Sequence, residues 1–390
     1  MDFDELIDRR NTHSNKWDMM QARYGVSPED GIPMWVADMD FRPPDAVSRA
    51  LQTMVDHGIY GYYGDDAAYL DAIGWWMRTR HGWELRPEWV FTTHGLVNGA
   101  ALCLQAFSQP GDGVVLFTPV YHAFFRVIRA AGREVVECPL VEKGGRMVMD
   151  LDAYDARMTG REKIAVLCSP HNPGGQVWTE DELRAVAEFA RRHDLVLISD
   201  EVHHDLVMPG HRHIVMANAA PGIQDRLVMM SATTKTFNLA GGHTGNVIIA
   251  DETLRKRFAK TLLGLGISAN SFGMEMARAA YSREGAEWVD ALCAYLDGNR
   301  RLFEEGARAI PGVKVTPLQA TYLEWVDFRG LGMDEAEVLR RIEGEARIAV
   351  NHGATFGEGG TGFQRFNIAT PRSRVAEAVE RLQAAFADVQ

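Results

Sequence analysis

Short runs of consecutive apolar residues alternate along the middle of the chain with longer segments that have the hydrophobic spacing of helices. The clearest runs are residues 114–117, 164–168, 195–199 and 227–230. Continuous apolar runs of this length, bounded by turn residues, are typical of strands buried on both faces of a parallel sheet. The pattern therefore predicts an α/β fold with a mostly parallel central sheet and flanking helices.

The pattern differs toward the two ends of the chain. Residues 33–44 are apolar but bounded by proline, which predicts an arm or loop rather than a central strand. Because 390 residues exceed the size at which a single core stops growing, we expect more than one domain. We expect an N-terminal arm with part of a small domain over residues 1–45, a large domain over residues 46–285, and a connector helix with a small α+β domain over residues 286–390.

Polar residues suited to chemistry follow three successive predicted strands. Asn172 follows the strand at residues 164–168, Asp200 and His203 follow the next strand, and Lys235 follows the third. Because the carboxyl ends of parallel strands meet at one edge of a sheet, we expect these side chains to converge on one crevice. A lysine desolvated there has a lowered pKa and can form a Schiff base with an aldehyde cofactor or a carbonyl substrate.

Two further segments have features of a ligand-binding site. A predicted strand at residues 90–93 passes through Gly95 directly into a helix, and such a junction exposes backbone N–H groups to an anion. Residues 60–64 form a glycine-containing aromatic turn whose phenols either pack on the surface or donate to a phosphate. Trp35 and the aspartates that follow it are equally compatible with a pocket wall and with a packing arm.

Four motifs in this order resemble those of the fold type I pyridoxal phosphate enzymes, the class I/II aminotransferase superfamily. They are Ser169-Pro-His-Asn-Pro-Gly-Gly175, Asp200-Glu-Val-His203, Ser231-Ala-Thr-Thr-Lys235-Thr-Phe-Asn-Leu-Ala240 and Gly362-Phe-Gln-Arg365-Phe-Asn367. The chain looks most like the cystathionine β-lyase or cysteine-S-conjugate β-lyase branch, on the basis of Trp35-Val-Ala-Asp-Met-Asp-Phe41, Gly61-Tyr62, His203 and the residues after Lys235. The resemblance covers nearly the whole chain and implies the aminotransferase fold, with pyridoxal 5′-phosphate as cofactor.

The resemblance implies a role for each residue at the strand ends. Lys235 would hold the cofactor covalently and then take the proton from the substrate Cα. Asp200 would pair with the pyridine nitrogen and keep it protonated, because a carboxylate in a dry site favours the charged form of a neighbouring base. Asn172 and His203 would donate to the ring oxygen, where most aminotransferases have a tyrosine in place of His203. Tyr121 would stack on the ring.

The resemblance also implies a cradle for the cofactor phosphate, made of backbone amides and hydroxyls. Its members would be the N–H groups of Leu96, Val97 and Asn98 and the side chains of Ser231, Thr233 or Thr234. The serine lies four residues before the lysine, where the superfamily usually has three, and this leaves open which hydroxyl binds. Many relatives also have an arginine shortly after the lysine, whereas this chain has His243.

The remaining residues that the resemblance implies bind the substrate or reach a second subunit. Arg365 would clamp the substrate α-carboxylate in a bidentate fork, and Asp40, Asn172 and Tyr121 would also bind the substrate. Tyr62 resembles a phosphate-binding tyrosine that comes from the other subunit. The implied active unit is therefore a homodimer in which Tyr62 reaches the partner's site.

Three functions are consistent with these residues. The first is a β-lyase that cleaves L-cystathionine or a related cysteine S-conjugate to a thiol, pyruvate and ammonia. The second is an aminotransferase that uses the same site with a 2-oxo acid acceptor. The shared residues serve both reactions, because the outcome depends on whether the substrate carries a leaving group on Cβ. The third is a non-catalytic pyridoxal-binding regulator, which the presence of Lys235 and Arg365 disfavours.

Composition narrows the partners and the compartment. The net charge of −12 disfavours nucleic acid and anionic membranes, since both require a basic surface. The four cysteines lie far apart and predict reduced thiols in the cytoplasm, and we find no signal peptide and no membrane span. Histidines at 203, 204, 211 and 213 lack the spacing of a metal site, so we expect no metal.

Overall fold

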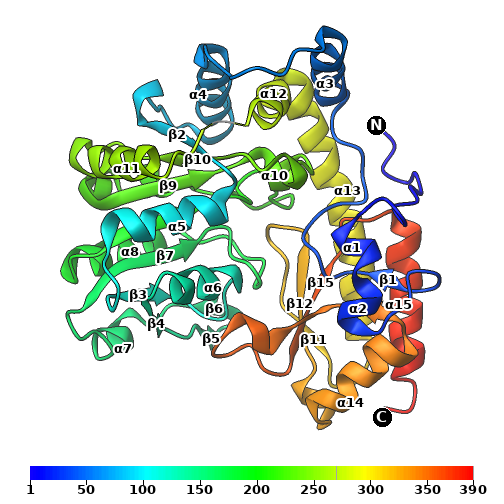
Figure 1. The fold of residues 1–390 in the computed structure, drawn as a ribbon. Helices are drawn as coiled ribbons and strands as arrows, with labels where there is room; N and C mark the ends of the chain where they lie inside the picture. The colour runs from blue at the N-terminus through cyan, green and yellow to red at the C-terminus, as the bar shows by residue number, and fades with distance from the viewer. Residues whose placement is uncertain (269, 390) are drawn as a thin grey trace.

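The computed structural model describes residues 1–268 and 270–389, and its largest element is a seven-stranded sheet (Figure 1). The strands, in spatial order, are β2 (Val90–Thr93), β10 (Gly245–Ile248), β9 (Leu227–Ser231), β8 (Val196–Asp200), β7 (Glu162–Cys168), β3 (Gly113–Leu116) and β4 (Glu134–Glu137). Neighbouring strands from β9 to β4 are parallel, and β10 is antiparallel to both of its neighbours. The predicted mostly parallel central sheet is confirmed.

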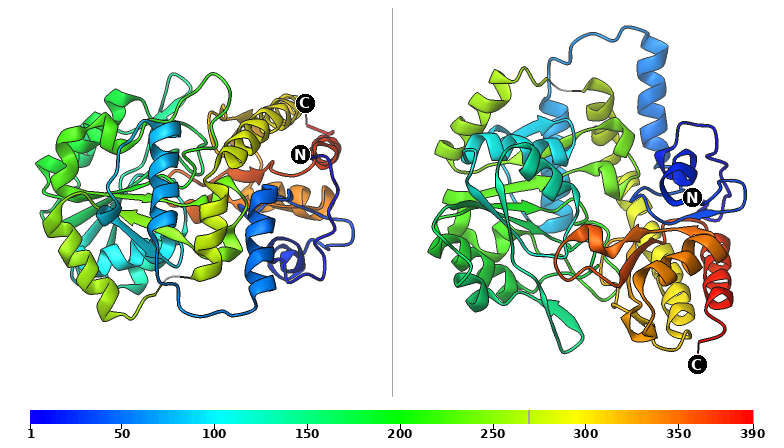
Figure 2. Two further views of the ribbon diagram at one scale, coloured as in Figure 1. Left: turned by 90° about the horizontal axis from the view of Figure 1, so that it is seen from above. Right: turned by 60° about the horizontal axis from the view of Figure 1, so that its bottom comes forward.

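Helices cover both faces of this sheet because both faces of its central strands are apolar. Along β7, Ala165 and Leu167 belong to one hydrophobic core, together with residues of α8 (Glu180–Arg192). Ile164 and Val166 belong to a second core, together with residues of α5 (Leu96–Phe107). Successive side chains of a strand point to opposite faces of the sheet, so the apolar side chains of β7 pack against helices on both faces. The helices are visible on both sides of the sheet in the view from above (Figure 2).

A second, antiparallel sheet lies beside the first (Figure 1). Its strands, in spatial order, are β11 (Lys314–Val315), β12 (Leu323–Asp327), β15 (Phe363–Asn367) and β14 (Asn351–His352). The long helix α13 (Arg283–Arg308), which corresponds to the predicted connector helix, runs from the first sheet to the second and packs against α15 (Arg372–Ala385) (Figure 1). The helix α14 (Glu335–Leu339) continues as a π-helix over Arg340–Glu345.

The N-terminal arm packs on this second unit. Its strand β1 (Ile32–Pro33) pairs in parallel with β13 (Ile348–Ala349). Its first helix α1 (Asn15–Asp18), which α2 (Met20–Tyr24) follows, contacts α15, because the Arg374 guanidinium lies over the ring of Trp17. The arm is otherwise irregular, as its prolines predict. The expected domain boundaries near residues 45 and 285 stay a prediction.

Shorter elements complete the chain. The remaining helices are α3 (Asp45–His57), α4 (Ala67–His81), α6 (Ala123–Ala130), α7 (Leu151–Asp155), α9 (Met216–Ala219), α10 (Thr233–Thr236), α11 (Glu252–Gly264) and α12 (Ser271–Ala280), and β5 (Val141–Lys143) pairs with β6 (Arg146–Val148). Short 3₁₀-helices are found at Pro87–Trp89, Pro221–Arg226, Ala240–Gly242, Arg329–Leu331 and Gly353–Phe356. None of the helices among the described residues combines the length and the apolar character that crossing a membrane requires.

Candidate functional site

The carboxyl ends of three adjacent strands form the base of the candidate site. In the register of the sheet, Cys168 of β7 lies opposite Asp200 of β8, and Asp200 lies opposite Met230 of β9. The segments that follow these residues therefore leave the sheet side by side. The strand ends and these segments carry Asn172, Asp200 with His203, and Lys235. These are the polar residues that the sequence analysis expected at one edge of the sheet.

Lys235 lies on α10, a single helical turn that begins two residues after β9. Its Nζ donates a hydrogen bond to the backbone carbonyl of Ala37 at 2.7 Å. Burial lowers the pKa of Lys235 to about 8, with the Arg365 charge acting in the same direction and Asp38 and Asp200 acting against it. A lysine with this pKa is readily deprotonated near neutral pH, which is what a nucleophilic or basic amine requires.

Asp200 is a buried carboxyl group with few partners. It is 5% exposed, and its side chain accepts one hydrogen bond, from the Val202 amide at 3.2 Å. Burial raises the pKa of Asp200 to about 7, and the positive charge of Lys235 opposes that rise. A carboxylate left this incompletely satisfied favours a cationic partner, such as a protonated ring nitrogen.

His203 and two serines supply buried polar atoms that have no hydrogen-bond partner among the described residues. These atoms are Nδ1 of His203 and the hydroxyls of Ser169 and Ser231. Burial, with the charges of Lys235 and Arg365, holds the pKa of His203 well below its ordinary value, so its imidazole is neutral. Because unsatisfied buried polar atoms are rare in folded proteins, their concentration at one strand edge fits a bound polar ligand.

Arg365 of β15 brings a positive charge to this edge from the second sheet. It is 2% exposed and donates to Asn172 Oδ1 at 3.0 Å, to the Trp35 carbonyl at 2.9 Å and to Asn351 Oδ1. Its guanidinium also lies over the ring of Phe356, 5.0 Å from the centroid.

No carboxylate among the described residues neutralises Arg365. Burial lowers its pKa to about 10, and only tyrosines act against that shift. A buried, unpaired guanidinium is costly unless an anion binds it. The side chain is therefore poised to bind a carboxylate ligand.

The predicted phosphate cradle lies where β2 passes into α5. Gly95 has φ 83°, a left-handed conformation that turns the chain directly from strand into helix. The first turn of an α-helix leaves its amides without intrahelical partners, and here these amides belong to Leu96, Val97 and Asn98. Ser231 ends β9, and Thr233 and Thr234 begin α10, so hydroxyls and free amides are available for a phosphate.

Tyr121 is the predicted stacking residue, and its environment connects it with the same site. Burial raises the pKa of Tyr121, and the nearby charges of Arg365 and Asp200 act on it in opposite directions. Its ring packs edge-on against Phe124, with centroids 5.7 Å apart. The phenol therefore lies within the electrostatic range of both site residues.

The structure does not bring Asp40, a predicted substrate-binding residue, to this group. Its carboxylate accepts hydrogen bonds from Arg9 at 2.9 Å, Lys16 Nζ at 2.9 Å and Trp17 Nε1 at 3.1 Å. The charges of Lys16 and Arg9 outweigh its burial and lower the pKa of Asp40 to about 2. Asp40 therefore holds the N-terminal arm together, and Asp38 is the aspartate of the arm whose charge acts on Lys235.

Tyr62 also lies apart from the site within one chain. Its side chain is fully exposed, and Ile59 and Tyr60 beside it are exposed as well. The neighbouring Tyr63 instead donates a hydrogen bond to Glu275 at 3.0 Å.

Two contacts of the site were not predicted from the sequence. Tyr322 donates to the carbonyl of Ala37 at 2.9 Å, the same oxygen that binds Lys235, and lies edge-on to His203. Asn351 orients Arg365. The contact between Tyr322 and Ala37 joins segments far apart in the chain, whereas Asn351 and Arg365 are partners on the neighbouring strands β14 and β15. The sequence analysis predicted neither contact.

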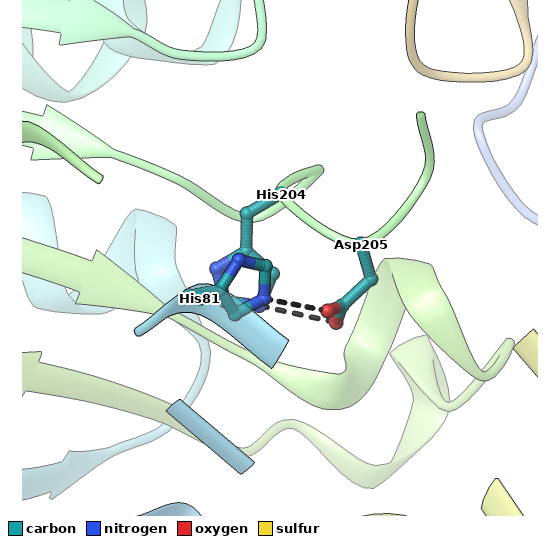
Figure 3. A group of neighbouring side chains, drawn as sticks. All are labelled: His81, His204 and Asp205. Carbon is teal, nitrogen blue, oxygen red and sulfur yellow. Dashed lines mark hydrogen bonds and ion pairs between the residues drawn. The ribbon is translucent and has the colours of Figure 1, made fainter. Parts of the chain in front are cut away.

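The predicted histidine cluster divides between two places. His203 lies in the site, whereas His204 lies with His81 and Asp205 on the other side of the same loop (Figure 3). The Nε2 atoms of His81 and His204 lie 2.8 and 3.1 Å from the two Asp205 oxygens. The absence of a metal stays a prediction.

Comparisons with known proteins agree over the full length of the chain. A family model described as aminotransferase class I and II matches residues 30–382. The chain is 36% identical to "Cystathionine beta-lyase PatB" of Bacillus subtilis (strain 168), with 99% of this chain and 100% of that protein covered. The crystal structure of cystalysin from Treponema denticola, which contains pyridoxal 5′-phosphate, has a TM-score of 0.94 and 35% identity and covers 100% of this chain and 99% of its own. The pyridoxal phosphate-bound C-S lyase from Staphylococcus hominis has a TM-score of 0.92 and 29% identity, with 99% and 98% covered.

Proposed function

Because this chain belongs to the class I and II aminotransferase family, we propose that it is a pyridoxal 5′-phosphate-dependent carbon–sulfur β-lyase. Its substrate is L-cystathionine or a related cysteine S-conjugate, and its products are a thiol, pyruvate and ammonia. The observation that carries this proposal is the buried, unpaired Arg365 at the same strand edge as Lys235 and Asp200. The full-length likeness to relatives named cystathionine β-lyase and C-S lyase favours elimination over amino transfer.

The described residues fit the cofactor on the chemistry of their free groups. The phosphate would be held by the hydroxyl of Ser231, which has no hydrogen-bond partner among the described residues, and by the hydroxyl of Thr233 or Thr234. The backbone amides of Leu96, Val97 and Asn98 would complete the phosphate site. Tyr121 would stack on the ring, Asn172 and His203 would bind its oxygen, and Asp200 would pair with its nitrogen. When bound, the cofactor withdraws electrons from the substrate Cα and so stabilises the charge that develops there.

The protein's own residues would orient the substrate and move its protons. Arg365 would bind the α-carboxylate with charge-assisted hydrogen bonds of about 1.5–3 kcal/mol each. Asn172 and Asn351 hold its guanidinium in place for this contact. Lys235, with its lowered pKa, would take the Cα proton as a neutral amine near neutral pH. The expulsion of the thiol from Cβ then follows from the substrate's own structure.

The proposed enzyme is a homodimer in the cytoplasm. The exposed tyrosine Tyr62, beside exposed Ile59 and Tyr60, supports a second copy of the chain as its partner, with Tyr62 reaching that copy's phosphate. Tyr62→Phe should weaken cofactor binding without changing the sedimentation of the dimer, and equilibrium dialysis and analytical ultracentrifugation measure the two effects. The four free cysteines support a reducing compartment.

The test is to mix the purified enzyme with L-cystathionine, without any 2-oxo acid, and to follow pyruvate and free thiol. Lys235→Ala should lower turnover by at least about 10²–10⁴-fold, the contribution of a positioned acid–base group. Lys163→Ala is the matched control, because this exposed lysine contacts only the nearby carbonyl of Gly160. Amino transfer on addition of 2-oxoglutarate, with no pyruvate formed from L-cystathionine, would contradict the lyase proposal in favour of an aminotransferase.

A further inference from the structure

The loop that carries Asp200 and His203 to the site sends its next residues in the opposite direction. Asp205 is 6% exposed and packs against the C-terminal end of α4. Its Oδ1 accepts from Trp76 Nε1 at 3.0 Å and lies 2.8 Å from His81 Nε2. Its Oδ2 accepts from Thr236 Oγ1 at 2.9 Å and lies 3.1 Å from His204 Nε2 (Figure 3). A carboxylate has about four lone-pair sites, so the hydrogen bonds with Trp76, His81 and Thr236 leave this group well satisfied.

The charges of the cluster favour hydrogen bonding over metal binding. Burial by itself raises the pKa of Asp205, but the charge of His204, with the hydrogen bonds of His204 and His81, outweighs it and holds that pKa well below its ordinary value. Burial, together with His204, lowers the pKa of His81, so that His81 is neutral and its Nε2–H is a donor to the carboxylate. Trp76 and Thr236 donate to the same carboxylate, so each of its two oxygens already accepts a hydrogen bond from an uncharged side chain.

One contact of this cluster reaches the element that carries the candidate catalytic lysine. Thr236 follows Lys235 on α10, which is a single turn with no side-chain N-cap. One isolated helical turn is unstable, so its orientation depends on side-chain anchors. The first anchor is the Thr236–Asp205 hydrogen bond, and the second is Asn238, whose amide binds the carbonyls of Met39 and Phe41 at 2.9 Å each.

We propose that Asp205, fixed by Trp76, His81 and His204, is a positioning residue that acts through Thr236 to set the rotation of α10 and the place of the Lys235 amine. The proposal rests on the function assigned to Lys235 above. Without this anchor the turn rotates, and the amine leaves its place 2.7 Å from the Ala37 carbonyl. The groups that face the amine, Asp38, Asp200 and Arg365, then act on it from different distances. Arg365 stays in place, because it lies on the second sheet.

The test compares two substitutions that differ only in the hydroxyl. Thr236→Val keeps the shape of the side chain and removes the donor, whereas Thr236→Ser keeps the donor. Thr261→Val is the matched control, because the hydroxyl of this half-buried threonine donates to the Arg257 carbonyl of its own helix and to no other group among the described residues. The measurements are kcat and KM for pyruvate release, the pH at which the absorbance of the cofactor-loaded enzyme changes, and thermal unfolding.

We expect Thr236→Val to lower kcat by about 10–100-fold, the effect of displacing a catalytic group by roughly 1 Å. KM should stay within about twofold, since Arg365 is untouched, and the spectral pH midpoint should shift. Thr236→Ser should restore the wild-type kcat and pH midpoint, and the control Thr261→Val should change neither of them. A folded Asp205→Asn variant should show the same split between kcat and KM.

Two results would overturn the proposal. One is a folded Thr236→Val enzyme with wild-type kcat and pH midpoint, or one that Thr236→Ser fails to rescue. The other is a stoichiometric divalent cation in the wild type that His81→Ala removes, because the cluster would then be a metal site. If the wild type forms no pyruvate but the pH midpoint still moves with Thr236→Val and returns with Thr236→Ser, the lyase assignment fails and the positioning role stands.

Discussion

Asp200, the last residue of β8, and Asp205, in the loop that follows it, are both buried carboxyl groups, yet their environments shift their pKa values in opposite directions. Asp200 accepts one hydrogen bond, from a backbone amide, and burial raises its pKa to about 7. Asp205 accepts hydrogen bonds from Trp76, His81 and Thr236. Its pKa lies well below the ordinary value because the charge of His204, with the hydrogen bonds of the two histidines, outweighs burial. Burial alone thus does not decide the charge of a carboxyl group; the neighbouring charges and hydrogen-bond donors decide it as well. The incompletely satisfied group marks a binding position, and the satisfied group fixes structure.

The largest expected effect is the loss of stability when the hydrogen-bonded carboxylate of Asp205 is removed. Asp205→Ala leaves the donors of Trp76, His81 and Thr236 buried without an acceptor, and it should lower the free energy of unfolding by about 3–5 kcal/mol. Urea denaturation of the apoprotein measures this. Asp290→Ala is the control, because Asp290 pairs with Arg80 at 2.7 Å while 65% exposed, and such pairs contribute about 1 kcal/mol or less. Equal losses in the two variants would remove the distinction between the two carboxylates.

We expect the opposite result for Asp200, namely a loss of activity without a loss of stability. Asp200→Asn removes the partner of the cofactor ring nitrogen and should lower kcat/KM by about 10²–10³-fold, the size seen when one electrostatic contact in a dry site is lost. Its apoprotein should be at least as stable as the wild type, since asparagine avoids the burial of a charge. The pyruvate assay and calorimetry test the two parts. An active but destabilised variant would mean that Asp200, like Asp205, is structural.

Arg365 extends the comparison to a buried cation without an anionic partner. Arg365→Lys loses the bidentate fork and should cost about 1.5–3 kcal/mol in kcat/KM for L-cystathionine. The same variant should differ little from the wild type on an S-conjugate that lacks the α-carboxylate, because that compound cannot use the fork. A similar loss on both compounds would show that Arg365 organises the site rather than binds the carboxylate.

The smallest expected effect is a shift in pH dependence. Because the pKa of Lys235 is lowered to about 8, its amine is mostly neutral above that pH, and the rate at which the apoprotein captures pyridoxal phosphate should rise with pH and level off above about 8. Asp38 opposes this lowering, so Asp38→Asn should move the midpoint to lower pH, by less than about one unit. Stopped-flow absorbance measures the rate. A midpoint near the ordinary lysine value would contradict the burial of this amine.

The sequence by itself determined the central sheet and the group of residues at its edge. Continuous apolar runs indicated strands buried on both faces, and the polar residues after three of them were correctly expected to emerge together, as the register of Cys168, Asp200 and Met230 confirms. The motifs around Lys235 and Arg365 also carried the family resemblance, which the family model confirms. These features are local or follow from one rule about parallel strands, so the order of residues is sufficient to predict them.

Only the tertiary structure decided which of several neighbouring polar residues face the site. Asp38 acts on Lys235, whereas Asp40 is held by Arg9, Lys16 and Trp17. His203 faces the site, whereas His204 turns away. The partners that make these choices lie far along the chain, as Trp76 lies 129 residues before Asp205. A side chain's direction in a loop is set by such packing partners, and no short-range pattern in the sequence encodes them.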